Sequence, residues 1–244
     1  MNDVIAMLQA HRSIRKFTAE SLADELIEEI VRCGQAAATS SNIQATTVIR
    51  VRDAGKRERI AELAGGQSYV ASAGAFLVFC ADLRRPQLAC ERQGGVFNGG
   101  MMEPFIVATV DVALSAQNCA VAAESLGLGI CYIGGIRNNP QAVSDLLELP
   151  DAVYPVFGLC LGHPDQDPEV KPRLPLSAVL MEDRYQDAVA LEGIERYDEQ
   201  LRDYYRHRSG GGKNSSWSEE MTILAGKSRP HMREFLVRRG FMMK

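Results

Sequence analysis

The chain has 244 residues, of which 46% are hydrophobic and 24% are charged, and its formal net charge is −4 at pH 7. This composition is typical of a folded globular protein and excludes a disordered or fibrous one. The slightly acidic balance argues against a general attraction to nucleic acid or anionic membrane, so any bound anion must be held by a local cluster of cations. The six cysteines are far apart and form no C-x-x-C pair, which favours a reducing cytoplasm.

The N-terminal part of the chain predicts two helices followed by a strand. A short helix ends near His11, and Ser21-x-x-Asp24 resembles a capping box. An apolar stripe behind that box predicts a second helix to about Ala37. The β-branched run 46–51 then predicts a strand.

The middle of the chain predicts a buried sheet with helices between its strands. The further strand candidates are 75–81, 129–133 and 154–161, and the helical stretches are 57–64, 105–126 and 139–147. The stretch from 105 to 129 is the most apolar, but it contains Asp111 and Glu124, so a buried helix is favoured over a membrane span. Its many small residues suit close packing at a domain centre or a dimer interface.

The last third of the chain changes in composition. Residues 163–175 hold four of the ten prolines and predict an extended loop. Apolar residues at helical spacing over 194–204 predict a helix, and the glycine- and serine-rich run 209–216 predicts a flexible loop. A last helix is predicted to start at 228–230.

The segment His11-Arg12-Ser13-Ile14-Arg15-Lys16 places several cations and a hydroxyl group directly after a helix. These are the donors that recognise phosphate. A second basic pair, Lys171 and Arg173, lies in the proline-rich loop. Each cluster alone is equally consistent with a solvated basic loop, and two clusters together favour a shared anion site.

Two other stretches offer polar or glycine-rich surfaces to a ligand. The run 39–44 is rich in hydrogen-bonding side chains, and 132–135 ends a strand with two glycines that allow a flat ligand to approach closely. An ordinary loop or turn would have the same composition. The chain contains no G-x-S-x-G, H-E-x-x-H or G-x-G-x-x-G motif, which argues against a serine hydrolase, a zinc enzyme and a Rossmann dinucleotide site.

Taken together, five ordered motifs resemble one known family over nearly the whole chain. They are H-R-S-I-R-K-F (11–17), T-S-S-N-I-Q (39–44), G-G-Q-S-Y (65–69), E-S-L-G-L-G-I-C-Y-I-G-G-I-R-N-N (124–139), and G-L-C-L-G-H-P with K-P-R-L-P (158–175). The family is that of the FMN-dependent nitroreductases, in the branch of oxygen-insensitive NADPH nitroreductases and NADPH:FMN oxidoreductases.

The resemblance implies an α+β fold with a mostly antiparallel central sheet surrounded by helices, in place of the doubly wound sheet that alternating elements suggest. It also implies a single domain over residues 1–244, in which the extended region 163–244 contributes to an intertwined homodimer and to the NADPH site. Two FMN sites would lie at the dimer interface, each built from both subunits.

The resemblance further assigns residues to the cofactors and the substrate, and no metal is implied. Those assigned to FMN are His11, Arg12, Ser13, Arg15, Thr39, Ser41, Gln44, Gln67, Tyr132, Ile133, Gly134, Gly135, Lys171 and Arg173. Within this set, His11, Arg12, Ser13, Lys171 and Arg173 are assigned to the phosphate and ribityl chain, Arg15 and Gln67 to the pyrimidine end of the ring, and Thr39, Ser41 and Gln44 to the partner subunit's site. Arg208 and Lys213 are assigned to NADPH, and Ser41, Asn42 and Arg229 to the substrate.

The chain departs from the family pattern in two places that bear on substrate preference. The glycine-rich segment 84–105 is a few residues longer than usual, and Asn42 stands where this branch often has a bulky residue. An ordinary ion pair is an alternative role for Arg229.

The implied reaction is a ping-pong one. NADPH delivers hydride to FMN and leaves, and an electron-poor acceptor such as a nitroaromatic or a quinone then takes two electrons. No protein side chain serves as a nucleophile, and Arg15 tunes the ring electrostatically. The alternatives are a flavin reductase that releases free reduced FMN, a non-catalytic flavin-binding module, and a domain that binds another anionic nucleotide.

Overall fold

The computed structural model describes residues 2–208 and 210–242. The chain forms two compact units. The first contains the chain up to residue 167 and again from residue 229, and the second contains residues 168–228.

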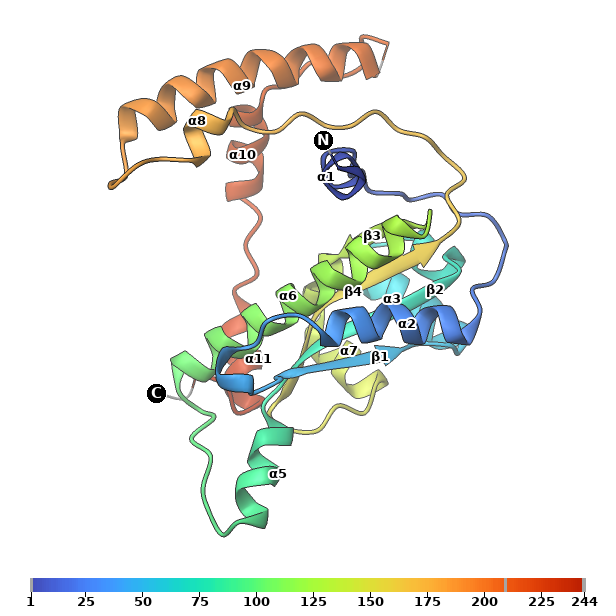
Figure 1. Ribbon diagram of the computed structural model, residues 1–244, viewed down its shortest axis with the longest axis vertical. Coiled ribbons are helices and arrows are strands. Elements are labelled where there is room, and N and C mark those ends of the chain that lie inside the picture. Colours follow the sequence, from blue (N-terminus) through green and yellow to red (C-terminus); the bar gives the residue numbers. More distant parts are fainter. Residues whose placement is uncertain (1, 209, 243–244) are drawn as a thin grey trace. The chain divides into compact units, whose positions relative to one another are not determined.

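The first unit is built on a four-stranded sheet (Figure 1). Its strands are β1 (Thr46–Arg50), β2 (Ala75–Asp82), β3 (Gly129–Ile133) and β4 (Val153–Gly162). They lie in the order β1-β2-β4-β3, and every neighbouring pair is antiparallel. The predicted antiparallel α+β fold is therefore confirmed, and so are the four predicted strands.

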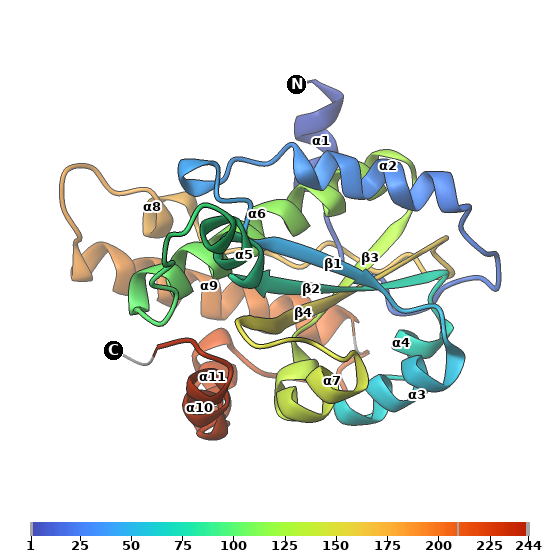
Figure 2. The same cartoon turned by 90° about the horizontal axis from the view of Figure 1, so that it is seen from below.

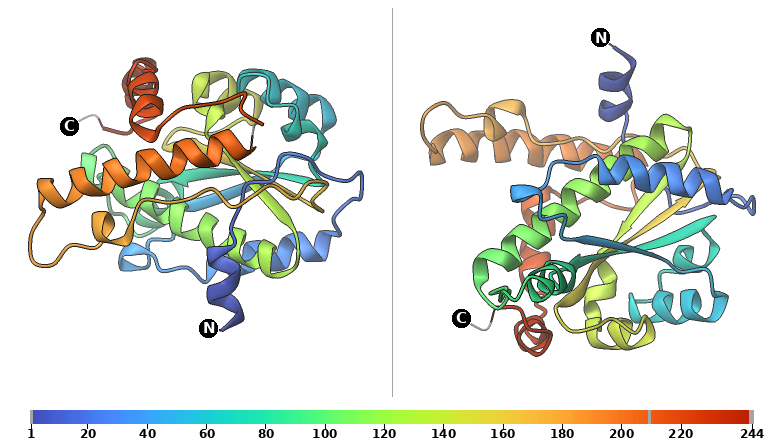
Figure 3. Two further views of the ribbon diagram at one scale, coloured as in Figure 1. Left: turned by 90° about the horizontal axis from the view of Figure 1, so that it is seen from above. Right: turned by 60° about the horizontal axis from the view of Figure 1, so that its bottom comes forward.

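Helices cover both faces of this sheet (Figure 2). Successive residues of β2 point to opposite faces, so Leu77 and Phe79 join one buried cluster and Phe76 and Val78 join another. Helices α2 (Asp24–Gln35) and α6 (Met102–Ser125) cover the first face, and they lie side by side (Figure 3). Helices α3 (Ala54–Leu63) and α7 (Pro140–Leu146) cover the second.

Helix α6 is the longest element of the described chain, and by length and composition alone it could cross a membrane. Its small residues Ala108, Ala116 and Ala120 are buried against the sheet and α2, as expected for a central core helix. Its other side leaves Ile106 and Val110 about half exposed.

The remaining elements are short, apart from one helix of the second unit. In the first unit they are α1 (Asp3–Gln9), η1 (Ser40–Asn42), α4 (Tyr69–Ser72), α5 (Arg84–Arg92), η2 (Gly134–Asn138) and α11 (His231–Arg238). In the second unit they are α8 (Leu176–Val179), α9 (Asp187–Arg208) and α10 (Trp217–Ala225). Within that unit, α8 and α10 pack against α9.

The predicted capping box at Ser21 is wrong. Helix α2 begins at Asp24, after Ala23, and has no side-chain cap. The Asp24 carboxylate instead accepts hydrogen bonds from Arg50 at 2.7 Å and Arg52 at 2.8 Å. These two hydrogen bonds lower the pKa of Asp24 below its ordinary value. The Asp24 carboxylate, which the local sequence predicted to cap the helix, is therefore bound by two arginines at the end of β1.

The sequence prediction missed α5 and α10. Helix α10 carries a local signal, because the Ser216 hydroxyl accepts from the Glu219 main-chain N–H and the Glu219 carboxylate accepts from the Ser216 N–H. Ser209, at the start of the predicted loop, lies outside the described residues, while residues 210–216 contain no helix or strand.

Candidate active site

The segment 11–17 lies beside the end of the sheet and is held there by its main chain. The Ile14 N–H donates to the Ile130 carbonyl of β3 at 2.8 Å, and the Asp165 N–H donates to the Lys16 carbonyl at 2.9 Å. Ile14 points into the protein and is buried. Gly129 makes this approach possible, because a Cβ atom there would lie 2.7 Å from the Ile14 side chain. The main chain of the segment is thus held in place by the sheet and by Ile14, whichever contacts its polar side chains make.

Two of the predicted phosphate-binding residues are paired with carboxylates in the structure. His11 Nδ1 lies 2.6 Å from Glu124 Oε1 of α6, and Arg12 forms an ion pair with the exposed Asp167. These four side chains line a surface hollow of about 690 Å³. The sequence prediction did not include Glu124 or Asp167, since they lie 113 and 155 residues away from their partners.

Arg15, Gln67 and Gly135 come together at the end of β3. The Tyr69 hydroxyl donates to Gln67 Oε1 at 2.5 Å, and Gln67 Nε2 donates to the Ala64 carbonyl at 2.7 Å. A Cβ atom on Gly135 would lie 2.3 Å from Gln67 Nε2, so this position requires glycine. Gln67 and Gly135, which the resemblance assigns to the ring, are therefore in contact, and Arg15 joins them through Tyr69.

The charge of Arg15 reaches this group through Tyr69. Burial raises the pKa of the Tyr69 hydroxyl, while the hydrogen bond and the positive charge of Arg15 act in the opposite direction. Among the ion pairs that the structure describes within the first unit, none involves Arg15, in contrast to His11 and Arg12. Arg15 as a whole is exposed. It is therefore a cation that can face an anionic ligand.

At the end of β3, the side chains of Tyr132 and Ile133 pack into the protein core. The Tyr132 ring packs edge-on against Phe157, with ring centroids 5.1 Å apart, and burial raises the pKa of its hydroxyl. Ile133 is fully buried on the opposite face of the sheet. What this strand end can present to a ligand is therefore mainly its backbone, continued by Gly134 and Gly135.

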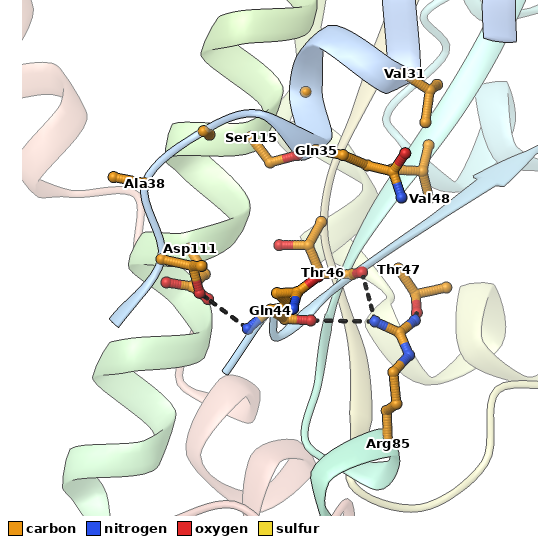
Figure 4. Close-up of a pocket in the computed structure, with 13 residues that line it drawn as sticks. Val31, Gln35, Ala38, Gln44, Thr46, Thr47, Val48, Arg85, Asp111 and Ser115 are labelled. Carbon is orange, nitrogen blue, oxygen red and sulfur yellow. Dashed lines mark hydrogen bonds between the residues drawn. The ribbon is translucent and has the colours of Figure 1, made fainter. Parts of the chain in front are cut away.

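The loop 39–45 connects α2 to β1 and has an unusual backbone. Ser41, Asn42 and Gln44 have positive φ angles of 48°, 55° and 52°. Asp111 of α6 accepts a hydrogen bond from the Thr39 hydroxyl and others from the main-chain N–H groups at both ends of the loop. A pocket of about 480 Å³ lies beside the loop, with Gln44, Asp111 and Arg85 around it (Figure 4).

In the second unit, two of the predicted cations meet on one tyrosine. Lys171 Nζ donates to the Tyr205 hydroxyl at 2.9 Å, and Lys213 Nζ lies 4.0 Å from the centre of the Tyr205 ring. Lys213 also pairs with Glu220 at 2.8 Å, and this hydrogen bond raises the pKa of the lysine. Lys171, Tyr205 and Arg173 line a hollow of about 410 Å³.

Two other predicted arginines hydrogen-bond to neutral groups. Arg208, at the end of α9, donates to the Tyr204 hydroxyl at 2.9 Å. Arg229, in the first unit, donates from Nε and Nη2 to Asn138 Oδ1 at 3.0 and 2.8 Å. Neither bond neutralises the guanidinium charge. Over residues 2–208 and 210–242, the structure contains no group of three or more His, Cys, Asp or Glu side chains that could hold a metal ion.

Comparison with known proteins gives one consistent result over the full length. The Nitroreductase family model matches residues 8–163, and the model of the Nitroreductase family, C-terminal domain, matches residues 171–244. The NADPH-flavin oxidoreductase of Vibrio harveyi is 46% identical over 98% of both chains, and the oxygen-insensitive NADPH nitroreductase of Salmonella typhimurium is 42% identical over 99% of both.

Solved structures agree with the sequence matches. Nitroreductase A from Vibrio parahaemolyticus superposes with a TM-score of 0.92 at 45% identity, and both chains are covered completely. The NADPH:FMN oxidoreductase from Vibrio harveyi complexed with NAD⁺ gives a TM-score of 0.91 at 43% identity, also over all of both chains. The chain therefore belongs to the nitroreductase family.

Proposed function

We propose that this protein is an FMN-dependent oxidoreductase that oxidises NADPH and reduces small electron-poor acceptors such as nitroaromatics and quinones. The observation that carries the proposal is the meeting of Arg15, Gln67 and Gly135 at the end of β3. The full-length relatives named for NADPH-dependent flavin and nitro-group reduction support the same function.

The chemistry of the donors fits FMN. A phosphate needs cations and hydroxyl groups, which His11, Arg12 and Ser13 supply from a segment fixed by the sheet. A flavin ring needs hydrogen-bonding groups at its polar end and flat backbone along its side, which Gln67 and the glycines after β3 supply. The assignment of Lys171 and Arg173 to the phosphate stays a prediction from the sequence.

The chain's residues would bind and tune the cofactor rather than react themselves. When bound, FMN supplies the transfer of two electrons from NADPH to the acceptor. Arg15 stabilises negative charge at the polar end of the ring, because a fixed cation there costs no reorganisation during the reaction. Tyr69 and Ala64 fix the direction of the Gln67 amide, which prevents it from rotating away.

The nicotinamide cofactor is assigned to the second unit. Arg208 and Lys213 are proposed to recognise the 2′-phosphate that distinguishes NADPH from NADH. The contacts of both residues with tyrosines limit the freedom of their side chains, so less entropy is lost on binding. Arg229 is proposed to face the substrate, together with Ser41 and Asn42.

The active form is proposed to be a homodimer located in the cytoplasm. Ile106, Val110 and Leu114 form an apolar row on α6 and are 47%, 50% and 42% exposed, which is unfavourable for a free surface. A second copy covering this row would bring the partner's Thr39, the partner's Ser41 and the partner's Gln44 to the cofactor. Reversal of the row's polarity in Val110→Lys should halve the molar mass measured by light scattering.

A second candidate function is the supply of free reduced flavin. It is suggested by two relatives, one named NADPH-flavin oxidoreductase and the other FMN reductase (NADPH). Steady-state kinetics separate the two functions. A protein that consumes FMN as a second substrate is a flavin reductase, whereas one that keeps its FMN and reduces a nitroaromatic is a nitroreductase.

Anaerobic titration tests the proposed function directly. We expect the purified protein to be yellow, or to become yellow with added FMN, and one equivalent of NADPH to bleach the flavin absorbance. Adding a nitroaromatic or a quinone should then reoxidise the flavin and restore the yellow absorbance. A protein that stays colourless with FMN, or that NADPH fails to bleach, would overturn the proposal.

A further inference from the structure

We infer that Asp111 is a positioning residue, which holds the loop 39–45 in the conformation that presents Ser41 and Asn42 to the cofactor and acceptor. The inference rests on the proposed function for what the loop contacts, but not for how the loop is held. Asp111 is not among the residues that the family resemblance assigns to a site.

The carboxylate of Asp111 ties the two ends of the loop to one point on α6. It accepts hydrogen bonds from the Thr39 hydroxyl, from the Ser40 N–H at 3.3 Å and from the Ala45 N–H at 3.1 Å. The Thr39 oxygen in turn accepts from the Gln44 N–H at 2.9 Å. A single side chain, 66 to 72 residues away in sequence, therefore closes the loop.

The burial of this carboxylate shows that it has a specific role. Asp111 is only 4% exposed, although it lies on a helix whose other buried residues are mostly small and apolar. Burial of an ionised group costs several kcal/mol unless hydrogen bonds replace its hydration. Here, all the donors that replace that hydration come from the loop, so the carboxylate and the loop depend on each other.

The loop needs such an anchor because its backbone is strained. Ser41, Asn42 and Gln44 lack the freedom of glycine at positive φ, and each costs on the order of 1 kcal/mol in this region. All three residues are exposed, so apolar burial does not compensate for the strain. Backbone strain of this kind persists only where the surrounding structure determines it.

A second contact fixes the far end of the loop. Arg85 Nη1 donates to the carbonyls of Gln44 at 3.1 Å and of Thr46 at 3.2 Å. The pocket of about 480 Å³ lies directly beside these groups (Figure 4). The hydrogen bonds to Asp111 and Arg85 therefore act together with the packing of Ile43 and Ala45 against the core to determine where Ser41 and Asn42 point.

The main test is Asp111→Asn, which keeps the size of the side chain but replaces one acceptor oxygen with an NH₂ group facing N–H donors. We expect the amide hydrogens of Ser40 and Ala45 to exchange at least about tenfold faster in the protein without added FMN, since the loss of about 1.4 kcal/mol of protection corresponds to that factor. In the FMN-loaded protein, we expect the KM for a nitroaromatic acceptor to rise about tenfold, while the KM for NADPH changes little.

Two further variants keep the inference testable if Asp111→Asn folds poorly. Thr39→Val removes only the hydroxyl donor, and we expect it to shift amide exchange and acceptor KM in the same direction by a smaller amount. In the double variant, the change in amide exchange and in acceptor KM should be smaller than the sum of the changes in the two single variants, because both substitutions act on one hydrogen-bonded group. Ser115→Ala, on the same helix and beside the same pocket, is the matched control and should change neither measurement.

The outcomes separate this inference from the proposed function. Faster amide exchange at Ser40 and Ala45 supports the anchor even if the wild-type protein fails to bind FMN, a failure that would count against the proposed function alone. A lower melting temperature of Asp111→Asn with wild-type exchange in the loop and a wild-type acceptor KM would overturn the inference, because Asp111 would then only stabilise the fold.

Discussion

The segment 11–17 and the loop 39–45 are both short polar stretches assigned to the cofactor, but they are held in different ways. The segment is fixed by one main-chain hydrogen bond to β3, by another to Asp165 after β4, and by the buried Ile14. The loop is fixed by one buried carboxylate and an arginine, and three of its residues have positive φ.

This difference determines which substitutions will disturb each region. Main-chain pairing does not depend on which side chain a residue carries, so the segment can offer the Arg15 cation to a ligand without using it in an ion pair, although His11 and Arg12 pair with Glu124 and Asp167. The loop depends on the side chains of Asp111 and Thr39. We therefore expect substitutions in the segment to change chemistry or binding, and substitutions that release the loop to change its geometry.

The largest effect is expected where the segment meets the sheet. In Gly129→Ala, the new methyl group would lie within 2.9 Å of three Ile14 carbon atoms, which forces the segment away from β3. Overpacking of this kind costs about 1–3 kcal/mol, so we expect a lower melting temperature and an FMN dissociation constant raised about 10- to 100-fold. Fluorescence titration with FMN and thermal unfolding will measure both.

Gly55→Ala in α3 is the control for that substitution, since its new methyl group would meet only an Asp53 side-chain oxygen at 3.4 Å. We expect no loss of FMN affinity there. Wild-type FMN affinity and stability in Gly129→Ala would show that the segment is not held by this contact, which would remove one side of the comparison.

The next effect concerns Arg15, whose main chain stays in place when its side chain is shortened. Arg15→Ala should slow turnover about tenfold at saturating FMN, because the cation that stabilises negative charge on the ring is lost, while FMN binding weakens less. The neighbouring exposed Lys16→Ala is the control and should turn over normally. Unchanged turnover in Arg15→Ala would rule out the proposed electrostatic role.

Alkaline pH tests the core that supports the two regions, since Cys80 lies in β2 of the sheet and Cys119 lies on α6, the helix that also carries Asp111. Burial raises the pKa of both thiols to about 12. Between pH 9 and pH 12 the thiols ionise in the unfolded chain but stay neutral in the folded one. The stability that this difference contributes is therefore fully present below the ordinary thiol pKa of 9.0 and is lost as the pH rises from 9 toward 12. We expect the free energy of unfolding to fall by about 1 kcal/mol per thiol at pH 10.

Denaturant unfolding at pH 8 and pH 10 will measure this loss of free energy of unfolding. In Cys119→Ala the loss should be smaller by the contribution of one thiol. Equal free energies of unfolding at the two pH values would contradict the expected effect of burial on these thiols.

The smallest expected effect concerns the His11–Glu124 pair, in which a side chain of α6 assists the segment. Glu124→Gln keeps the shape of the partner but removes its charge, so His11 is held less firmly through Nδ1. We expect the FMN dissociation constant to rise about threefold, as typical for a hydrogen bond worth about 0.6 kcal/mol. An effect as large as that of Gly129→Ala would mean that the segment also depends on a side chain, and the two regions would then be held alike.

Local patterns in the sequence were sufficient for the strands, most of the longer helices and the basic segment. Apolar runs indicated β2 and β4, and Asn139 followed by Pro140 indicated the start of α7, where the Asn139 side chain accepts from Ala142 as expected. The ordered motifs together indicated the family and the antiparallel sheet. The predicted single domain, the homodimer and the site assignments stay predictions.

Only the tertiary structure decided how the site residues are supported. The sequence indicated Asp111 merely as a charge that opposes a membrane span, and the fold makes it the anchor of the loop 39–45. The sequence likewise assigned Asp24 to a helix cap, and the fold pairs it with Arg50 and Arg52. The physical reason is the same in both cases. Helix and strand patterns arise from neighbouring residues, whereas the partner of a buried or bridging carboxylate is determined by contacts between residues 26 to 72 positions apart, which no local pattern contains.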